Sequence, residues 1–212
     1  MPPISPVSRA LSILDRSFGI IAPSSFLDSI AIYHDLLSTW NNYSSLMSSR
    51  DFESSFPEHI ADSLTLVPYV GREISAGKVY VDIGTGGGLP AIPISIIHQA
   101  APSILVERNQ RKATFLRKVC ATLSLHHVKI LCTSFPDHLS LPHPFALTAR
   151  AIEKPEIFID ALAAAMKPGS LFLRQTGLSA SPVPRCLRTQ RITDQFDAEG
   201  LRRGLLFSVF KI

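Results

Sequence analysis

A short apolar stretch that ends in an acid and four glycines constrains the fold of this chain more than any other feature. Residues 79–93 read VYVDIGTGGGLPAIP, with Asp82 before the glycines and Pro90 and Pro93 after them. The apolar start has the composition of a strand, and prolines suit the first turn of a helix, where amides have no partner within the helix. A strand that turns through glycine into a helix exposes backbone amides beside the positive end of that helix. This run therefore predicts that a small ligand lies against the turn.

The chain beyond residue 78 alternates short apolar stretches with longer amphipathic ones. The apolar stretches predict strands at residues 79–83, 103–106, 128–132, 145–149 and 170–174. The amphipathic ones predict helices at residues 90–99, 110–123 and 155–166. This alternation predicts an α/β fold with a parallel, doubly wound, Rossmann-like sheet. Residues 179–191 are rich in Ser, Pro and Arg and predict a loop before a hairpin-like stretch at residues 205–212.

The first part of the chain has a helical pattern instead. Apolar residues recur at three- and four-residue steps at Ile30, Tyr33, Leu36, Leu37 and Trp40, and residues 59–70 form a second such segment. We therefore expect a helical N-terminal lobe at residues 1–77 and a ligand-binding domain at residues 78–212.

The charge of the chain is distributed unevenly between these two parts. Residues 1–77 carry 4 Arg and Lys against 8 Asp and Glu, and residues 78–212 carry 17 against 9, which gives −4 and +8. A basic surface favours polyanions, because neutralised phosphates release counterions, although a basic domain without such a partner is equally compatible with the charge. No apolar stretch approaches the roughly 18 residues of a membrane span, and no secretion signal is evident, so we expect a cytoplasmic protein without a membrane partner. The 3 cysteines have no metal-binding spacing, and no metal is expected.

The spacing of the glycines narrows the choice of ligand. A phosphate-binding P-loop requires Gly-Lys-Ser/Thr, but Leu89 follows Gly88. A dinucleotide fingerprint requires a glycine where Leu89 stands. The remaining pattern, D-x-G-x-G-x-G, is similar to the first motif of class I methyltransferases, which use S-adenosyl-L-methionine. Such a site needs a second acid after the next strand for the ribose hydroxyls, and Glu107 follows ILV there.

Several further segments resemble one family within this class. The run GTGGGLPAIPISI resembles the G-T-G-x-G-L-P-G-I-P-L-x-I signature of the bacterial 16S rRNA guanine-N7 methyltransferases, the RsmG or GidB family. Matching segments follow the family's order at Trp40-Asn41, at HIADSL (residues 59–64), at Arg111-Lys112 with Phe115-Leu116, and at Ala149-Arg150-Ala151. The resemblance covers roughly residues 27–177.

This resemblance implies roles for individual residues. It places the methionine end of the cofactor against Gly84, Thr85, Gly86, Gly88 and Leu89. It places Glu107 at the ribose, Phe135 and Pro136 at the adenine, and Arg150 where cofactor and target base meet. Asp82 and Glu107 are then two carboxylates at successive strand ends that hold opposite portions of the methyl donor. The implied partner is 16S rRNA or the small ribosomal subunit, and we expect the protein to act as a monomer.

The chemistry of methyl transfer is compatible with these residues. In-line displacement at a sulfonium methyl requires positioning at about 3–3.5 Å, and guanine N7 has an available lone pair. Neither the D/N-P-P-Y/F motif of amine methylation nor a Pro-Cys nucleophile is present. Arg150 could hold guanine O6, a phosphate or the cofactor carboxylate, or could form only a surface ion pair with Glu153. His59 could belong to the site or serve as a capping or core histidine.

Two sets of basic residues could bind folded RNA. One lies on the predicted helix at residues 110–123 and the other lies in the tail: Arg111, Arg117 and Lys118, then Arg185, Arg188, Arg191, Arg202 and Arg203. Two alternatives stay open. The acceptor could be another RNA or a small molecule. Because Pro136 and Thr176 depart from the family pattern, the chain could also be a non-catalytic RNA-binding or ribosome-assembly protein on a decayed methyltransferase scaffold.

Overall fold

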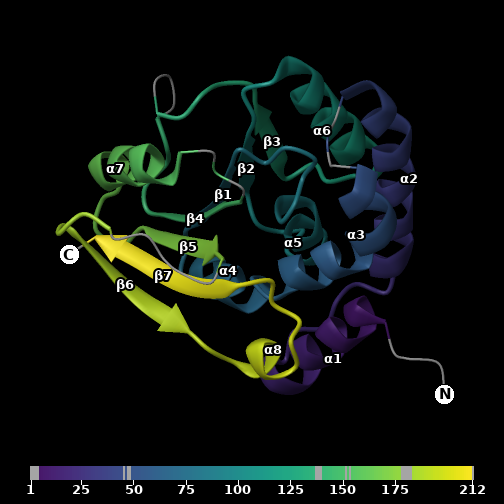
Figure 1. Ribbon diagram of the computed structural model, residues 1–212, viewed down its shortest axis with the longest axis horizontal. Coiled ribbons are helices and arrows are strands. Elements are labelled where there is room, and N and C mark those ends of the chain that lie inside the picture. Colours follow the sequence, from purple (N-terminus) through teal and green to yellow (C-terminus); the bar gives the residue numbers. More distant parts are fainter. Residues whose placement is uncertain are drawn as a thin grey trace.

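A computed structural model describes residues 5–44, 46, 49–136, 140–150, 152, 154–177 and 183–211. Its helices are α1 (Pro6–Phe18), α2 (Phe26–Ser44), α3 (Ser49–Leu64), α4 (Val67–Ser75), α5 (Ala91–Ile97), α6 (Gln110–Thr122), α7 (Pro155–Ala165) and α8 (Gln195–Ala198) (Figure 1). Its strands are β1 (Val79–Ile83), β2 (Ser103–Val106), β3 (Val128–Leu131), β4 (Phe145–Ala149), β5 (Leu171–Thr176), β6 (Leu187–Ile192) and β7 (Leu205–Lys211). No described helix is both long enough and apolar enough to span a membrane.

The strands form one seven-stranded sheet in the order β3-β2-β1-β4-β5-β7-β6. β1 to β5 are parallel, which confirms the five predicted strands and the α/β fold. β7 runs antiparallel to both β5 and β6. The order of the parallel strands reverses between β1 and β4, and ligands of open α/β sheets bind beyond the carboxyl ends of the strands at such a point.

Two segments differ from the prediction. The loop predicted at residues 179–191 was wrong for its last part, because β6 begins at Leu187 and pairs with β7. Residues 188–191 are exposed at the edge of the sheet, so this strand reads as polar in the sequence. The single helical segment predicted at residues 59–70 is two helices. α3 ends at Leu64 and α4 begins at Val67, with Pro68 in its first turn.

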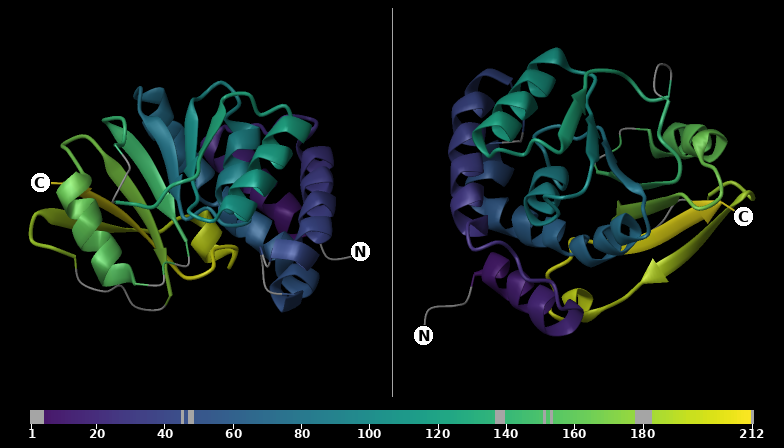
Figure 2. Two further views of the ribbon diagram at one scale, coloured as in Figure 1. Left: turned by 90° about the horizontal axis from the view of Figure 1, so that it is seen from above. Right: turned by 180° about the vertical axis from the view of Figure 1, so that it is seen from behind.

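Each face of the sheet has its own apolar core. Adjacent residues of β1 point to opposite faces, so that Tyr80 packs with the N-terminal helices, α5 and α6, whereas Val81 packs with α7. Figure 2 shows α7 on one side of the sheet and the other large helices on the opposite side. The first core joins residues from both predicted parts of the chain, including Tyr33 and Phe115. The division into domains at residue 77 stays a prediction.

Candidate functional site

A cleft of about 700 Å³ lies at the carboxyl ends of the strands, where the strand order reverses. The turn after β1 forms one wall, and the segments after β2, β3 and β4 contribute further residues. α7 contributes Ile157, which is exposed, and Phe158, which is partly buried. The residues predicted to bind the cofactor that line this cleft are Gly84, Thr85, Gly86, Leu89, Glu107, Phe135, Pro136 and Arg150. Asp82 and Gly88 are not among the lining residues.

The glycines of the turn have different surroundings. Gly84 and Gly86 have φ angles of 70° and 57°. A Cβ at Gly84 would meet no atom within 4 Å, and one at Gly86 would meet only the Gly84 carbonyl at 3.8 Å. At Gly88, with φ 102°, a Cβ would lie 2.6 Å from Ile92 Cγ1. Gly84 and Gly86 therefore leave bare backbone at the cleft, whereas Gly88 lets the turn pack on α5.

Hydrogen bonds to two separate segments hold the turn. The backbone N–H of Gly84 donates to the Val106 carbonyl at 2.9 Å, which ties the turn to β2. The hydroxyl of Tyr33, a buried residue of α2, donates to the Gly87 carbonyl at 2.6 Å. Burial raises the pKa of Tyr33, so this hydroxyl keeps its proton. An N-terminal helix therefore fixes the shape of the glycine turn.

Glu107 connects the turn to the next strand end. Its Oε2 accepts a hydrogen bond from the Gly86 N–H at 2.9 Å, and its Oε1 accepts one from the Asn109 N–H at 2.8 Å. The residue is 6% exposed and lines the cleft. A carboxylate has about four acceptor positions, so each oxygen retains one after these bonds. The geometry suits a ligand with two adjacent hydroxyl groups, such as a ribose.

Asp82 lies beneath the cleft rather than on its surface. It is 1% exposed, and its Oδ1 accepts a hydrogen bond from the Thr148 hydroxyl at 2.5 Å. Burial raises the pKa of Asp82 to about 7, although the Thr148 hydroxyl favours the ionised form. A cation bound nearby would shift this carboxyl group toward its charged form.

Aromatic side chains form the wall near α7. Phe135, which follows β3, packs against Phe158 of α7 with ring centroids 5.4 Å apart, and Phe158 packs against Phe172 of β5 at 5.8 Å. Phe135 and Phe158 both line the cleft. Pro136 also lines it and has no backbone N–H to offer a ligand. This wall can bury a flat ring by apolar contact.

Arg150 joins the cleft to the N-terminal helices. Its Nη2 lies 2.9 Å from His59 Nδ1, and its Nη1 lies 3.5 Å from Asp62 Oδ2. His59 lines the cleft and Asp62 is 2% exposed, and both belong to α3. Burial raises the pKa of Asp62, and the Arg150 guanidinium opposes that rise. Glu153, the alternative partner predicted for Arg150, and Ala151 lie outside the described residues.

Asp62 was not among the predicted site residues, and the pattern around His59 was compatible either with the site or with a capping or core histidine. A signal was present, because residues three apart on a helix share a face, and His59 and Asp62 have that spacing. Asp62 Oδ1 also accepts hydrogen bonds from the Gln175 side chain at 3.0 Å and from the Arg203 N–H at 2.7 Å. These two contacts come from β5 and from the turn before β7, and no local sequence pattern predicts them.

The chain matches the family model of rRNA small subunit methyltransferase G over residues 27–199. The chain belongs to the rRNA small subunit methyltransferase G family. A family member from Neisseria gonorrhoeae is 30% identical over 151 residues, which cover 71% of this chain and 70% of that protein. Another, from Sorangium cellulosum, is 30% identical over 194 residues, which cover 85% of this chain and 77% of that protein.

Solved structures agree on the fold. An O-methyltransferase from Bacillus cereus in complex with SAH has a TM-score of 0.59 at 12% identity, and the match covers 97% of this chain and 100% of the other. A mutant of MtNAS in complex with S-adenosylmethionine has a TM-score of 0.54 at 16% identity, and that match covers 97% of this chain and 77% of the other. The chain therefore has the Rossmann-like fold of class I methyltransferases.

The cleft of this methyltransferase family member is strongly basic. Four cations line it: Arg108, Lys112, Arg150 and Lys154. Glu107 is the only acid among the lining residues that the structure describes. On α6, Phe115, Leu116 and Val119 are buried while Arg111, Arg117 and Lys118 are exposed, as the amphipathic pattern predicted. Within the described ranges, no three His, Cys, Asp or Glu residues gather as a metal site.

Proposed function

We propose that this protein transfers a methyl group from S-adenosyl-L-methionine to N7 of a guanine in 16S rRNA of the small ribosomal subunit. The observation that carries this proposal is the convergence of the glycine turn, Glu107 and Arg150 on one cleft, in a chain that matches the family over residues 27–199. The basic lining suits a nucleic acid, because phosphate neutralisation supplies much of the affinity of such complexes.

The residues of the cleft fit the proposed cofactor. The open space beside Gly84 and Gly86 admits a ligand close to the backbone, and the free acceptor positions of Glu107 suit ribose hydroxyls. Phe135 and Phe158 provide an apolar wall for adenine, and Asp82 places a buried carboxyl group beneath the turn. When bound, S-adenosyl-L-methionine supplies a methyl group on a positively charged sulfur.

The proposed reaction asks the protein mainly to position two reactants. Guanine N7 has a lone pair in the imidazole ring of the base, so no general base is needed to activate it. Arg150, held by His59 and Asp62, is placed to bind guanine O6 or a phosphate beside the base and so to fix the direction of attack. Correct placement alone can lower such a barrier by several kcal/mol.

A labelling experiment tests the function directly. Purified protein and S-adenosylmethionine carrying a labelled methyl group are incubated with small ribosomal subunits that lack the modification. We expect label in 16S rRNA, recovered as 7-methylguanosine after digestion to nucleosides. Label that appears only in other RNA or in small molecules contradicts the assigned acceptor.

Calorimetry with S-adenosylmethionine addresses the remaining alternative. Pro136 lines the cleft without a backbone donor, which favours a weaker adenine site or a decayed scaffold. We expect measurable heat of binding. If the protein binds rRNA but shows no heat of cofactor binding, the proposed enzyme is ruled out in favour of a non-catalytic RNA-binding or ribosome-assembly protein.

A further inference from the structure

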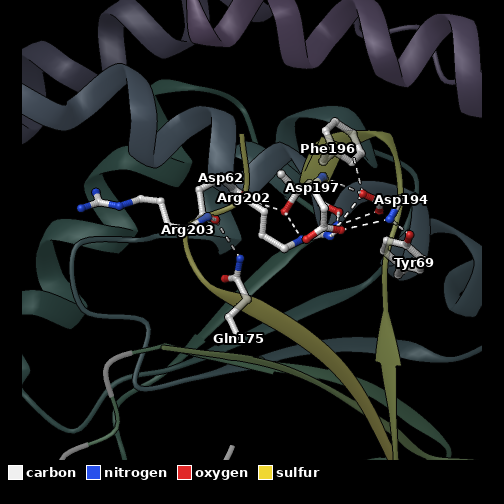
Figure 3. Close-up of polar contacts among 9 residues, drawn as sticks. Asp62, Tyr69, Gln175, Asp194, Phe196, Asp197, Arg202 and Arg203 are labelled. Carbon is white, nitrogen blue, oxygen red and sulfur yellow. Dashed lines mark hydrogen bonds and ion pairs between the residues drawn. The ribbon is translucent and has the colours of Figure 1, made fainter. Parts of the chain in front are cut away.

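Two adjacent arginines in the turn before β7 have opposite surroundings. Arg202 has a side chain that is 0% exposed, whereas Arg203 is exposed. Figure 3 shows their side chains extending in opposite directions, Arg202 toward Asp194 and Asp197 and Arg203 away from them. Both arginines were predicted to belong to one set of basic residues that could bind RNA. That grouping was wrong for Arg202, which is buried and cannot reach a polyanion.

Arg202 fixes the turn to the N-terminal helices. Its guanidinium donates to Asp194 Oδ2 at 2.8 Å and also pairs with Asp197, at the start of α8. It approaches the Thr65 carbonyl, between α3 and α4, at 3.4 Å. The hydroxyl of Tyr69 in α4 donates to Asp194 at 2.5 Å. Two carboxylates around one buried cation compensate its charge, so Arg202 is a structural anchor.

The other side of the same turn is fixed by its backbone. The N–H of Arg203 donates to Asp62 Oδ1 at 2.7 Å, the carboxylate that also pairs with Arg150. At Gly204, which has φ 96°, a Cβ would lie 2.1 Å from the Thr176 carbonyl oxygen. Only glycine permits this close approach to the end of β5. The position of Arg203 is therefore determined by contacts with α3, β5 and α8.

The Arg203 guanidinium lies against the same imidazole as Arg150. Arg203 Nη1 is 3.1 Å from His59 Nδ1 and 2.9 Å from His59 Nε2, and Arg150 Nη2 is 2.9 Å from Nδ1. A neutral imidazole has one acceptor nitrogen, so it cannot satisfy two guanidinium groups. Because both groups reach one ring nitrogen, they are close enough to donate to different oxygens of a single phosphate.

The charges of this cluster are not balanced by the contacts within it. Asp62 is the carboxylate in contact with Arg150, while the acids near the turn, Asp194 and Asp197, are bound to Arg202. Among the described residues, no carboxylate forms an ion pair with the Arg203 side chain. Two guanidinium groups that face one carboxylate at the edge of a cleft favour an anion.

We propose that Arg203 is a substrate-binding residue that, together with Arg150, holds a phosphate of the RNA chain next to the target guanine. This inference rests on the proposed function. Arg202 and Asp62 act through Arg203 as positioning residues, because they fix the turn that carries it. A phosphate held here sets the register of the RNA without reading its sequence.

Salt-dependent kinetics on small ribosomal subunits test the proposal. Arg203→Gln removes the charge but keeps the backbone N–H that bonds to Asp62, so the fold is expected to survive and is checked by thermal melting. We expect KM to rise about tenfold with kcat within about twofold. The slope of log(kcat/KM) against log salt is negative, and we expect it to become less steep by about 0.7–0.9, as for one lost phosphate contact.

Two further variants make the result specific. Arg16→Gln removes an exposed arginine of α1 outside the cleft, and we expect it to change neither KM nor the slope. Arg203→Lys keeps the charge but loses the planar pair of donors. We expect its salt slope to equal that of the unsubstituted protein and its KM to lie between the values of the unsubstituted protein and Arg203→Gln. An unchanged slope and KM in Arg203→Gln would overturn the proposal.

Cofactor binding separates this inference from the proposed function. The affinity of Arg203→Gln for S-adenosylmethionine is expected to equal that of the unsubstituted protein, and a parallel loss assigns Arg203 to the cofactor instead of the RNA. If the unsubstituted protein methylates no RNA, the proposed function fails. The phosphate contact can then still be tested by measuring equilibrium rRNA binding at several salt concentrations. If the slope of log affinity against log salt is the same for Arg203→Gln as for the unsubstituted protein, the phosphate contact is rejected.

Discussion

The glycine end of the cleft, formed by Gly84, Gly86 and Glu107, is built from two neighbouring strand ends. At the arginine end, His59 and Arg150 line the cleft, while Asp62 contacts Arg150 and Arg203 contacts His59. This end joins α3, the end of β4 and the turn before β7. Backbone geometry defines the glycine end, whereas charge and hydrogen bonds between distant segments define the arginine end. We therefore expect the proposed cofactor contacts and the proposed RNA contacts to depend on different interactions, so that substitutions can disturb one without the other.

The largest expected effect is on folding and concerns the arginine end. Asp62→Ala removes the acceptor used by Arg150, Gln175 and the Arg203 N–H. Because buried donors then lack a partner, we expect the free energy of unfolding to fall by about 3–5 kcal/mol, measured by urea denaturation. Asp15→Ala, at an exposed acid of α1, is the control and should change it by less than about 0.5 kcal/mol. Equal losses would show that the arginine end does not depend on this carboxylate.

A second test separates two glycines within one turn. Gly88→Ala is expected to lower the free energy of unfolding by about 2–4 kcal/mol, because the Cβ clashes with Ile92 at a positive φ. Gly84→Ala is expected to cost only about 1–2 kcal/mol, since its Cβ meets open space. Cofactor affinity, measured by calorimetry at equal concentrations of folded protein, should show the reverse order. Gly84→Ala is expected to weaken cofactor binding more than Gly88→Ala. Equal effects of the two substitutions on both measurements contradict the assignment.

Glu107→Ala tests whether the glycine end holds the cofactor. The substitution removes the acceptors of the Gly86 and Asn109 N–H groups and the proposed ribose contact. Hydrogen bonds to a charged group contribute about 1.5–3 kcal/mol, so we expect S-adenosylmethionine to bind roughly 10- to 100-fold more weakly in calorimetry. Asp15→Ala again serves as the control. Near-normal binding by Glu107→Ala would remove this acid from the site.

The smallest expected effect is a pH dependence of stability from Asp82. Its pKa of about 7 in the folded protein exceeds its ordinary value of 3.8, so between these values the folded state holds a proton that the unfolded chain releases. The stabilisation is therefore complete at low pH and is lost as pH rises through 7. Relative to Asp82→Asn, the unsubstituted protein should lose about 1.4 kcal/mol of unfolding free energy between pH 6 and pH 8. Urea denaturation of both proteins at pH 6 and pH 8 measures this difference. If the free energy of unfolding changes equally in both proteins, Asp82 is not the titrating group.

Most of the fold was predictable because its signals are local. Four of the five parallel strands are mostly buried and apolar, and α6 buries Phe115, Leu116 and Val119 on one face. β6 was missed because its exposed residues at the edge of the sheet leave no apolar pattern in the sequence. The segment at residues 59–70 was predicted as one helix, but packing and Pro68 fix a break between α3 and α4.

The candidate site was predictable in part for the same reason. The glycine turn and Glu107 follow consecutive strands, so their spacing along the chain places them at adjacent strand ends. The sequence could not distinguish Gly84, beside open space, from Gly88, which packs against Ile92. It also grouped Arg202 with Arg203, because burial of one and exposure of the other depend on Asp194 and Asp197.

The sequence by itself determined the strand, the glycine turn and the acid that follows the next strand, because backbone preferences and hydrophobic periodicity act over a few residues. Tertiary structure alone decided that Arg150 and Arg203 lie against His59 and that Asp62 bonds to three segments. Residues separated by more than 140 positions in the chain come together only after the sheet and its covering helices have packed. Their arrangement is therefore a product of the whole fold.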